Sequence, residues 1–358
     1  MRLAFLHGSN DLYGASRVLA QDVELLLAQG HEIAVALPQD GPLTGILRGL
    51  GAEVSVESLR VLRKVDGAAG MRPPTRLPTV CENADIVVLW TLALAAYLPL
   101  LRRRRRRVLC SVHEILPGSA GRLLAAAACA LSHALMVNSR ATAQWLTRDL
   151  RRRRPQLAYP IAPPYRPLAR VADGAGVLQL LVMGRVNGHK GHIEAVRAAQ
   201  LARDAGAEVE LTLLGGAFAG QERHLVELLA AIEGLPWARY GGEVADPRES
   251  LRECEVVLIP TTRPEPFGLV AIEAWAAGRR VIASDQGGLA EATAMVEGVQ
   301  VAAGDVTALC RAIVRVARDP AMRAAPAASA PASELCTRAA RELAWQACLR
   351  HANLSMAA

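Results

Sequence analysis

The chain has 358 residues, which is too many for one ordinary hydrophobic core and fits two domains. Its mean hydropathy is +0.20, yet the longest apolar run, at residues 86–101, contains Thr91 and Pro99 and is shorter than the roughly 20 residues that a membrane-spanning helix needs. The formal net charge is +7, but few aromatic residues lie among the basic ones, so the pattern does not favour nucleic acid as a partner.

The cysteines, the acidic residues and the N-terminal residues indicate where the protein is located in the cell and whether it holds a metal. Seven cysteines are scattered along the chain without a Cys-x-x-Cys pair, which predicts reduced core thiols and neither a disulfide framework nor a metal site. No Asp-x-Asp pair occurs, so we expect no metal held by carboxylates and no cofactor. The N-terminus has no long apolar stretch and no small-residue cleavage site, which predicts a cytoplasmic protein without a secretory signal.

Short apolar strands alternate with helical segments through the N-terminal half, which is typical of a parallel α/β sheet. We expect strands at residues 3–7, 32–37, 53–56, 86–90, 108–112 and 134–138, and helices at 15–29, 119–131 and 141–150. The loop after the first strand lacks Gly-x-Gly-x-x-Gly, which weakens an interpretation as a nicotinamide-dinucleotide enzyme. Residues 60–79 contain three prolines, which predict an irregular segment, and residues 161–167 contain three more, which predict a linker.

Two arginine clusters stand out in this half. One immediately precedes a predicted strand and the other follows a predicted helix, so both should lie at the amino edge of the sheet. Such a surface suits anionic lipid headgroups, at about 1 kcal/mol per arginine, and a solvated face in an arginine-rich chain explains it equally well. The ten residues are Arg102, Arg103, Arg104, Arg105, Arg106, Arg107, Arg151, Arg152, Arg153 and Arg154.

The second half opens with a buried strand at 177–183 that runs into a glycine-flanked turn. Gly184 and Gly191 enclose Arg185 and Lys190 there. Two cations in a strand-to-helix turn can be brought onto a diphosphate by the backbone around them. Lysine is rare in this chain, with two among 41 basic residues, so Lys190 is not easily explained as basic background.

Residues 255–291 organise the second half. An apolar strand ends in a loop with three prolines, a helix follows, and a second strand covers 281–284. Ligands of open parallel sheets bind beyond the carboxyl ends of the strands, where Glu265 and Glu273 are expected to lie. A carboxylate can accept hydrogen bonds from two vicinal hydroxyls, and the amides of Phe267, Gly268 and Leu269 suit a phosphate, so together they indicate a nucleotide sugar.

Glu265-Pro266-Phe267-Gly268 followed by Glu273 resembles the Glu-seven-Glu signature of retaining glycosyltransferases of the GT-B fold, in particular glycosyltransferase family 4, the glycosyl transferases group 1. The resemblance implies an α/β protein with two Rossmann-like parallel-sheet domains facing a central cleft. Those domains would cover residues 1–160 and 168–333, with 161–167 as the linker. A last helix within 334–358 would pack back toward the first domain.

The resemblance also implies roles for individual residues. Glu265 would lie against the donor sugar, Glu273 would accept from the ribose hydroxyls, and Arg185 with Lys190 would clamp the diphosphate. In the N-terminal half, His113 follows a strand and resembles the family histidine that hydrogen-bonds the donor sugar. The remaining donor-binding positions would be Gly14, Gly184, Phe267, Gly268, Leu269 and, in the loop that meets the base, Glu243.

These expectations describe an enzyme that moves a hexosyl or N-acetylhexosaminyl unit from a UDP- or GDP-sugar to a hydroxyl acceptor with retention. A lipid-linked or cell-envelope glycan is among the candidate acceptors, and peripheral contact with the inner face of a membrane would fit the arginines. Two alternatives remain at this point. One is a sugar-nucleotide epimerase of GT-B shape, and the other is a non-catalytic basic protein of the membrane surface.

Overall fold

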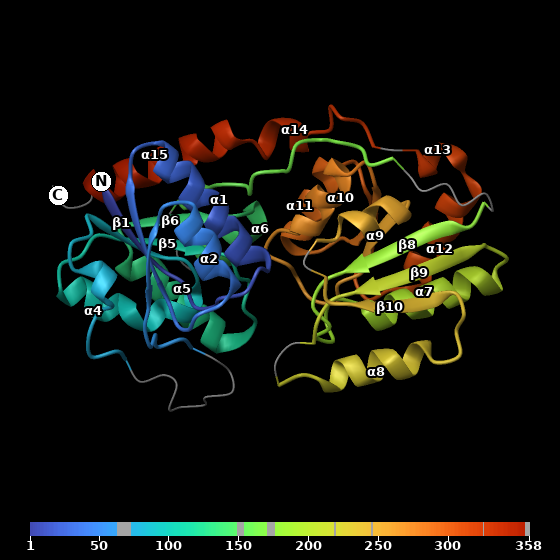
Figure 1. The fold of residues 1–358 in the computed structure, drawn as a ribbon, viewed down its shortest axis with the longest axis horizontal. Helices are drawn as coiled ribbons and strands as arrows, with labels where there is room; N and C mark the ends of the chain where they lie inside the picture. Colours follow the sequence, from blue (N-terminus) through green and yellow to red (C-terminus); the bar gives the residue numbers. More distant parts are fainter. Residues whose placement is uncertain are drawn as a thin grey trace. The chain divides into compact units, whose positions relative to one another are not determined.

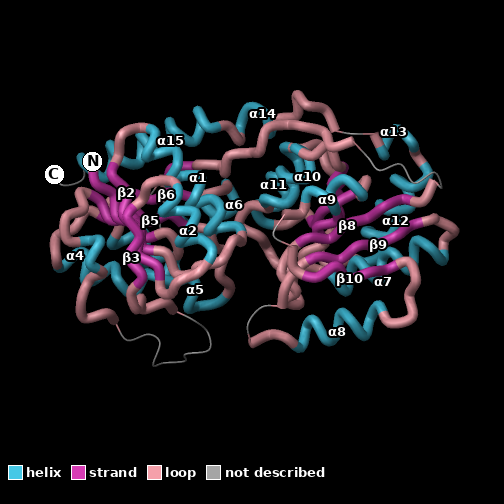
Figure 2. The backbone as a smooth tube through the Cα atoms, viewed as in Figure 1, coloured by secondary structure: helices cyan, strands magenta, loops and turns pink. Residues whose placement is uncertain are grey.

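A computed structural model describes residues 1–62, 73–148, 154–169, 176–217, 220–244, 246–324 and 326–354 (Figure 1). The chain divides into two compact units. Unit 1 comprises Met1–Ile161 and Cys336–Ala358, and unit 2 comprises Ala162–Leu335. Each unit contains one sheet of its own, as the separate sets of strands in Figure 2 show.

The sheet of unit 1 is parallel throughout and has seven strands in the order β3-β2-β1-β4-β5-β6-β7. Phe5 in the central strand pairs with Val35 on one side and with Val88 on the other. The strands are β1 (Arg2–Leu6), β2 (Glu32–Leu37), β3 (Glu53–Val56), β4 (Ile86–Leu89), β5 (Val108–Val112), β6 (Ala134–Val137) and β7 (Gln156–Leu157).

Helices cover both faces of this sheet because its strands are apolar on both faces. The face that includes Leu6 packs on η3 (Leu92–Tyr97), α4 (Leu98–Arg103) and α5 (Gly118–Leu131). The face that includes Phe5 meets α15 (Arg338–Leu354), whose Trp345 lies edge-on to the Phe5 ring. Figure 1 shows α15 beside α1 (Gly14–Ala28). The shorter helices are η2 (Thr79–Cys81), α2 (Pro42–Gly49) and α6 (Arg140–Thr147).

Unit 2 repeats this plan with six parallel strands in the order β10-β9-β8-β11-β12-β13. In chain order they are β8 (Leu178–Met183), β9 (Val209–Leu214), β10 (Ala238–Gly242), β11 (Val256–Ile259), β12 (Arg280–Ser284) and β13 (Val299–Val301). One face packs on α7 (His192–Asp204), α8 (Arg223–Ile232) and α12 (Val306–Arg318). Figure 1 shows α9 (Arg248–Glu253), α10 (Leu269–Ala276) and α11 (Gly287–Met295) on the other face.

The fold class predicted from the sequence is confirmed, because both sheets are parallel and covered by helices on their two faces. Strands β2, β3 and β5 have the predicted bounds. The apolar run at 86–101 divides into β4, η3 and part of α4, and no helix among the described residues is long and apolar enough to cross a membrane.

The predicted irregular segments fared less well. Residues 320–333 are rich in alanine, proline and serine, a composition that predicts a flexible surface segment, but Pro320–Arg323 form α13 and Ala332–Leu335 form α14. The side chain of Asp319 caps α13 by accepting from the Ala321 N–H, a local signal that the alanine-rich composition obscured. Part of the excursion predicted at 60–79 lies outside the described residues, and so do Arg151, Arg152 and Arg153.

Candidate active site

The loop after β8 holds Lys190 between two glycines that the backbone requires. Gly191 caps α7 with a φ of 80°, and a Cβ atom there would lie 1.9 Å from the carbonyl oxygen of Pro260, which follows the neighbouring strand β11. Gly184 follows β8 with a φ of 149°, a conformation that favours glycine. The two glycines therefore fix the start and the end of the loop that carries Lys190.

Lys190 and Glu265 form an ion pair at the carboxyl edge of the unit 2 sheet. The Nζ atom of Lys190 lies 2.8 Å from Oε1 of Glu265, and the side chains are 28% and 13% exposed. Their loops are also joined by the Thr262 N–H, which donates to the His189 carbonyl at 2.9 Å. An ammonium group has three N–H donors, so its bond to Glu265 still allows Lys190 to donate to a ligand oxygen.

Two helices begin beside Glu265. Gly268 caps α10 in a left-handed conformation with a φ of 111°. The backbone of Glu265 bridges to Gly287, and the Gly288 N–H donates to the Glu265 carbonyl at 2.7 Å. A Cβ atom on Gly288 would lie 2.0 Å from the Pro266 carbonyl oxygen, so glycine is required where α11 begins. The first-turn amides of α10 and α11 thus lie close to the carboxylate-bearing loop, in a place suited to an anion.

The other predicted residues on α10 differ in their access to a ligand. Phe267 is 3% exposed and belongs to the core, so its predicted role in donor binding is restricted to its backbone. Leu269 and Glu273 are half-buried and lie four positions apart, which places them on one face of the helix. Glu273 therefore lies one turn further into α10 from the edge where Glu265 is found.

Arg185 and Glu243 lie where the ends of β8, β9 and β10 meet. A Cβ atom on Gly215 would lie 1.7 Å from the Gly184 carbonyl oxygen, so the backbones after β8 and β9 are in direct contact. Glu243 is exposed, and its Oε2 lies so near Gly216 that a Cβ there would be 2.4 Å away. Arg185 is half-buried directly after Gly184. The predicted donor residues of unit 2 therefore occur together at one sheet edge.

The sequence prediction did not include two histidines of the Lys190 loop. His192 begins α7, is 4% exposed and lies with Nε2 3.3 Å from the Leu214 carbonyl oxygen. Burial lowers its pKa to about 4, so it is neutral at physiological pH. Burial also lowers the pKa of the half-buried His189, as do the charges of Lys190 and Arg263. The position of His189 inside the glycine-flanked turn, and that of His192 directly after it, was the signal that could have identified them.

In unit 1, His113 follows β5 at the carboxyl edge of the sheet. It is 9% exposed, its Nε2 lies 2.8 Å from Ser111 Oγ, and its ring centroid lies 4.5 Å from that of Trp90. Burial holds the pKa of His113 well below its ordinary value, and the nearby Arg341 and His7 lower it further. A neutral imidazole can exchange hydrogen bonds with a sugar hydroxyl, which is the chemistry predicted for this residue.

His7 is a residue of this edge to which the sequence prediction gave no site role. It directly follows β1, is 1% exposed, and its Nε2 lies 2.9 Å from Ser16 Oγ and 3.2 Å from Ser9 Oγ. Burial lowers its pKa to about 4, although Asp11 acts in the opposite direction. A polar residue directly after an apolar strand was the available signal. Gly14, which the sequence prediction did include, is exposed and begins α1 nearby in sequence.

Glu114 anchors the backbone around His113. Its carboxylate accepts from the Leu92 N–H at 3.1 Å and from the His113 N–H at 3.0 Å. Burial raises the pKa of Glu114 to about 7, although these backbone donors lower it. The loop after β4 and the loop after β5 are therefore held together by one carboxyl group beside His113.

Comparisons with known proteins place this architecture. Residues 178–319 match the family model described as glycosyl transferases group 1. The structure of Anabaena HepE in complex with UDP and glucose superposes with a TM-score of 0.79 and 21% identity, covering 98% of this chain and 99% of that one. Sucrose-phosphate synthase from Thermosynechococcus elongatus gives 0.73 and 19%, covering 100% of both chains. The chain has the GT-B fold.

Sequence relatives match a smaller part of this GT-B chain. A D-inositol 3-phosphate glycosyltransferase of Arthrobacter is 35% identical over 136 residues, which cover 36% of this chain and 32% of that protein. A glycogen synthase of Mycobacterium tuberculosis is 32% identical over 158 residues, which cover 43% of this chain and 37% of that protein. The chain thus matches these curated relatives over about a third of their length.

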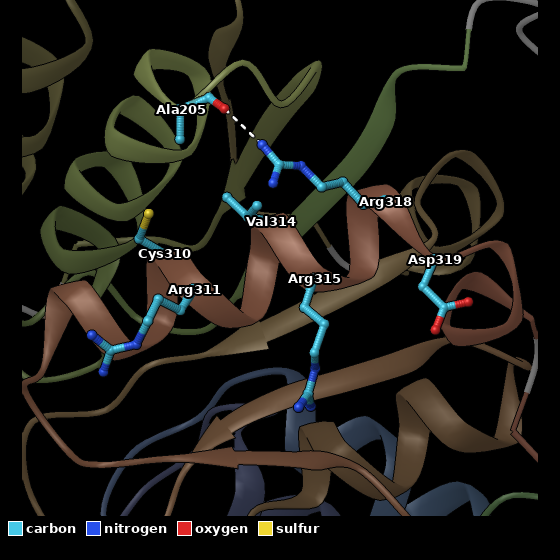
Figure 3. A pocket seen from close by; sticks show the side chains of 7 residues that line it. All are labelled: Ala205, Cys310, Arg311, Val314, Arg315, Arg318 and Asp319. Carbon is cyan, nitrogen blue, oxygen red and sulfur yellow. Dashed lines mark hydrogen bonds between the residues drawn. The ribbon is translucent and has the colours of Figure 1, made fainter.

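A cavity of about 520 Å³ lies elsewhere in unit 2 of the GT-B fold (Figure 3). It is lined by Ala205 at the end of α7 and by residues of α12, among them Arg311, Arg315 and Arg318. The Arg318 guanidinium donates to the Ala205 carbonyl at 2.9 Å. In alternating strand and helix order, helix C-termini lie at the amino edge of the sheet, so this cavity is at the opposite edge from Lys190 and Glu265.

Within the described ranges, no group of three or more His, Cys, Asp and Glu side chains could hold a metal ion. The expectation of a site without a metal or cofactor stays a prediction.

Proposed function

We propose that the protein is a retaining glycosyltransferase that moves a hexosyl or N-acetylhexosaminyl unit from a UDP- or GDP-sugar to a hydroxyl acceptor. The Lys190–Glu265 pair carries this proposal. It joins the glycine-flanked loop after β8 to the loop from which α10 begins, at the carboxyl edge of the unit 2 sheet. A cation beside helix amides suits a diphosphate, and an adjacent carboxylate suits sugar hydroxyls, so one place can hold both parts of a nucleotide sugar.

The donor assignment draws on further support. HepE, which shares the fold, has been solved with UDP and with UDP-glucose. Arg185 follows Gly184 directly and would act with Lys190 on the two phosphates. Glu273, one turn into α10, would accept from the ribose hydroxyls, while Glu265 would accept from the sugar. Glu243 would lie near the base, at the ends of β9 and β10.

The reaction breaks the bond between the sugar's anomeric carbon and the diphosphate oxygen and forms a bond from that carbon to the acceptor oxygen. Negative charge builds on the departing oxygen, and Arg185, Lys190 and the helix amides would stabilise it there. The acceptor hydroxyl would attack from the face that the diphosphate leaves, which retains the configuration, and its proton would leave with the nucleoside diphosphate. The neutral His113 of unit 1 would exchange a hydrogen bond with a sugar hydroxyl.

The acceptor is proposed only as a class. The relatives' names specify D-inositol 3-phosphate, glycogen and lipopolysaccharide, all of them rich in hydroxyl groups. We propose a hydroxyl acceptor of that kind, with a lipid-linked or cell-envelope glycan among the candidates.

A ligand screen tests the donor class. Thermal unfolding would be followed with UDP, GDP and ADP and with their common sugar conjugates. A ligand at 100 times its dissociation constant stabilises by about 2.7 kcal/mol, which is a readily measured shift. We expect UDP or GDP compounds to stabilise the protein, and stabilisation by none of the nucleotides would contradict the proposal. Incubation with the donor alone then separates transfer from epimerisation, because only an epimerase would return an isomerised nucleotide sugar.

Two matched variants test the division of roles between the glutamates. Glu273→Gln should weaken binding of both the nucleoside diphosphate and the intact donor, because the ribose is common to both ligands. Glu265→Gln should weaken binding of the sugar-bearing donor more than that of the nucleoside diphosphate. Isothermal titration calorimetry measures all four affinities. Equal losses for both variants toward both ligands would mean that the assigned roles are wrong.

A further inference from the structure

Trp90 contacts both the first turn of α1 and His113, the two parts of the candidate site in unit 1. It directly follows β4 and is fully buried. Its indole Nε1 donates to the carbonyl oxygen of Ala15 at 2.8 Å, next to Gly14 in the first turn of α1. Its ring lies against His113, with centroids 4.5 Å apart and planes 33° apart. One side chain therefore sets the distance between the start of α1 and the histidine after β5.

Trp90 is supported in turn by the C-terminal helix. The ring of Trp345 on α15 lies parallel to that of Trp90, with an interplanar angle of 6° and a centroid separation of 6.4 Å. Phe5 of β1 lies against both rings, at 5.7 Å from Trp90 and 5.9 Å from Trp345. All three side chains are fully buried. Because well-packed interiors leave little free volume, the position of Trp345 limits the positions open to Trp90.

Helix α15 is itself fixed one turn before Trp345. Arg341 is 1% exposed and forms a two-pronged ion pair with Asp22 of α1, in which Nη2 lies 2.6 Å from Oδ2. The same guanidinium donates to the carbonyl oxygens of Ala158 at 2.7 Å and Tyr159 at 2.9 Å. A bidentate pair of this kind has little geometric freedom, so α15 cannot slide along the sheet without breaking it.

His113 has one ring nitrogen that this framework can direct toward a ligand. Ser111 occupies Nε2 at 2.8 Å, and among the described residues no hydrogen-bond partner is found for Nδ1. The side chain is 9% exposed, so a small part of it can be reached from outside. A small rotation of the ring would change the direction of a hydrogen bond from Nδ1, and misplacing such a contact is costly in a site that binds a transition state.

We propose, on the basis of the glycosyl transfer proposed above, that Trp345 is a positioning residue for the reaction. Through Trp90 it sets the orientation of His113 and the place of the first turn of α1. The C-terminal helix is then part of the catalytic apparatus of unit 1 as well as part of its fold. The sugar-bearing part of the reaction should depend on it, and binding of a nucleoside diphosphate to unit 2 should not.

The test compares Trp345→Leu, Trp345→Phe and a control, Leu349→Ala, which opens the buried face of the same helix at a residue that is 6% exposed. We expect Trp345→Leu to lower kcat/KM for transfer at least tenfold while affinity for the nucleoside diphosphate stays unchanged. Trp345→Phe keeps an aromatic ring and should recover most of that loss. An equal loss in Leu349→Ala at equal loss of stability, or a wild-type rate in Trp345→Leu, would overturn the proposal.

A second readout does not depend on the activity. In protein labelled at histidine, the imidazole resonances of His113 are assigned by their disappearance in His113→Gln. We expect them to move in Trp345→Leu, because Trp90 lies over the His113 ring, while those of His189 and His192 in unit 2 stay in place. Unmoved His113 resonances would overturn the positioning role. A wild-type protein that binds no nucleotide sugar would instead count against glycosyl transfer, whatever the resonances show.

Discussion

The two units carry candidate residues at the same edge of similar sheets but hold them by different means. In unit 2, glycines allow backbone contacts that any side chain would block, such as the 1.9 Å separation between a Cβ on Gly191 and Pro260. The residues held there, Lys190 and Glu265, are charged and partly exposed. In unit 1, His113 is buried and neutral, and the aromatic ring of Trp90 holds it in place.

The difference shows two ways of fixing a functional group. Where the backbone itself is constrained, a polar side chain can remain partly exposed because its starting point is set. Where side chains provide the constraint, they have to be buried to pack well, and a titratable group among them that has no charged partner, such as His113, loses its charge. Unit 2 is therefore suited to binding an anion and unit 1 to uncharged hydroxyl contacts.

The largest expected effect is a loss of stability on breaking the buried Arg341–Asp22 ion pair, which fixes α15 in unit 1. Arg341→Met leaves Asp22 buried without its partner, which should lower the free energy of unfolding by about 3–5 kcal/mol. Burial already raises the pKa of Asp22, and Arg341 opposes that rise. Chemical denaturation measures the loss. The matched control is Arg338→Ala, which removes the exposed pair with Glu342 on the same helix and should cost about 0.3–0.5 kcal/mol.

The corresponding change in unit 2 should affect function more than stability. Lys190→Ala removes a charge-assisted contact to the diphosphate worth about 1.5–3 kcal/mol, which corresponds to roughly 10- to 150-fold in kcat/KM. The free energy of unfolding should change by less than about 1 kcal/mol, since the ion pair between Lys190 and Glu265 is partly exposed. Arg239→Ala is the control, because it removes an exposed ion pair with Glu253 near the start of β10. Equal kinetics in both variants would refute the clamp.

The same difference explains how much the sequence could predict. The Lys190 turn and the Glu265 loop are short motifs whose glycines and prolines are visible locally, and the structure places them together. The surroundings of His113 come from Trp90, Arg341 and Trp345, which lie far apart in sequence. Nothing local marks which apolar residues will stack on the histidine. His7 was not assigned a role because a polar residue directly after an apolar strand looks the same in the sequence whether it contacts a ligand or only ends the strand.

The arginines at the amino edge of the unit 1 sheet give a smaller expected effect, on membrane binding. They lie away from the carboxyl edges that carry the candidate residues of the two units. Arg102 and Arg103 end α4, and Arg104 and Arg105 follow it. All four are exposed, while Arg107 is half-buried and donates to Asn353. At about 1 kcal/mol per exposed arginine, we expect binding to anionic vesicles that is lost at high salt. Co-sedimentation of the wild type and of a variant with the four exposed arginines changed to serine tests this. Equal binding to neutral vesicles would leave the cluster as a solvated face.

The smallest effect comes from Glu114, the half-buried carboxyl group beside His113 in unit 1. Because burial raises the pKa of Glu114 from 4.5 to about 7, the folded protein holds a proton between those values that the unfolded chain has released. Stability contributed by this group is therefore present below pH 4.5 and is lost as the pH rises through 7. Glu114→Gln removes this pH dependence of the free energy of unfolding. If the glutamine amide accepts fewer hydrogen bonds from the backbone, the variant also loses an amount of stability that is the same at every pH.

Chemical denaturation of the wild type and Glu114→Gln at pH 5, 6, 7 and 8 measures the difference between the two proteins. We expect the variant to gain relative to the wild type by on the order of 1 kcal/mol across this range, since partial exposure of Glu114 reduces the full linkage value. The buried His7 and His192, whose pKa values are lowered to about 4, act in the opposite direction but are common to both proteins and cancel. A difference that does not change with pH would mean that Glu114 ionises normally, and that the site of unit 1 is as open to water as that of unit 2.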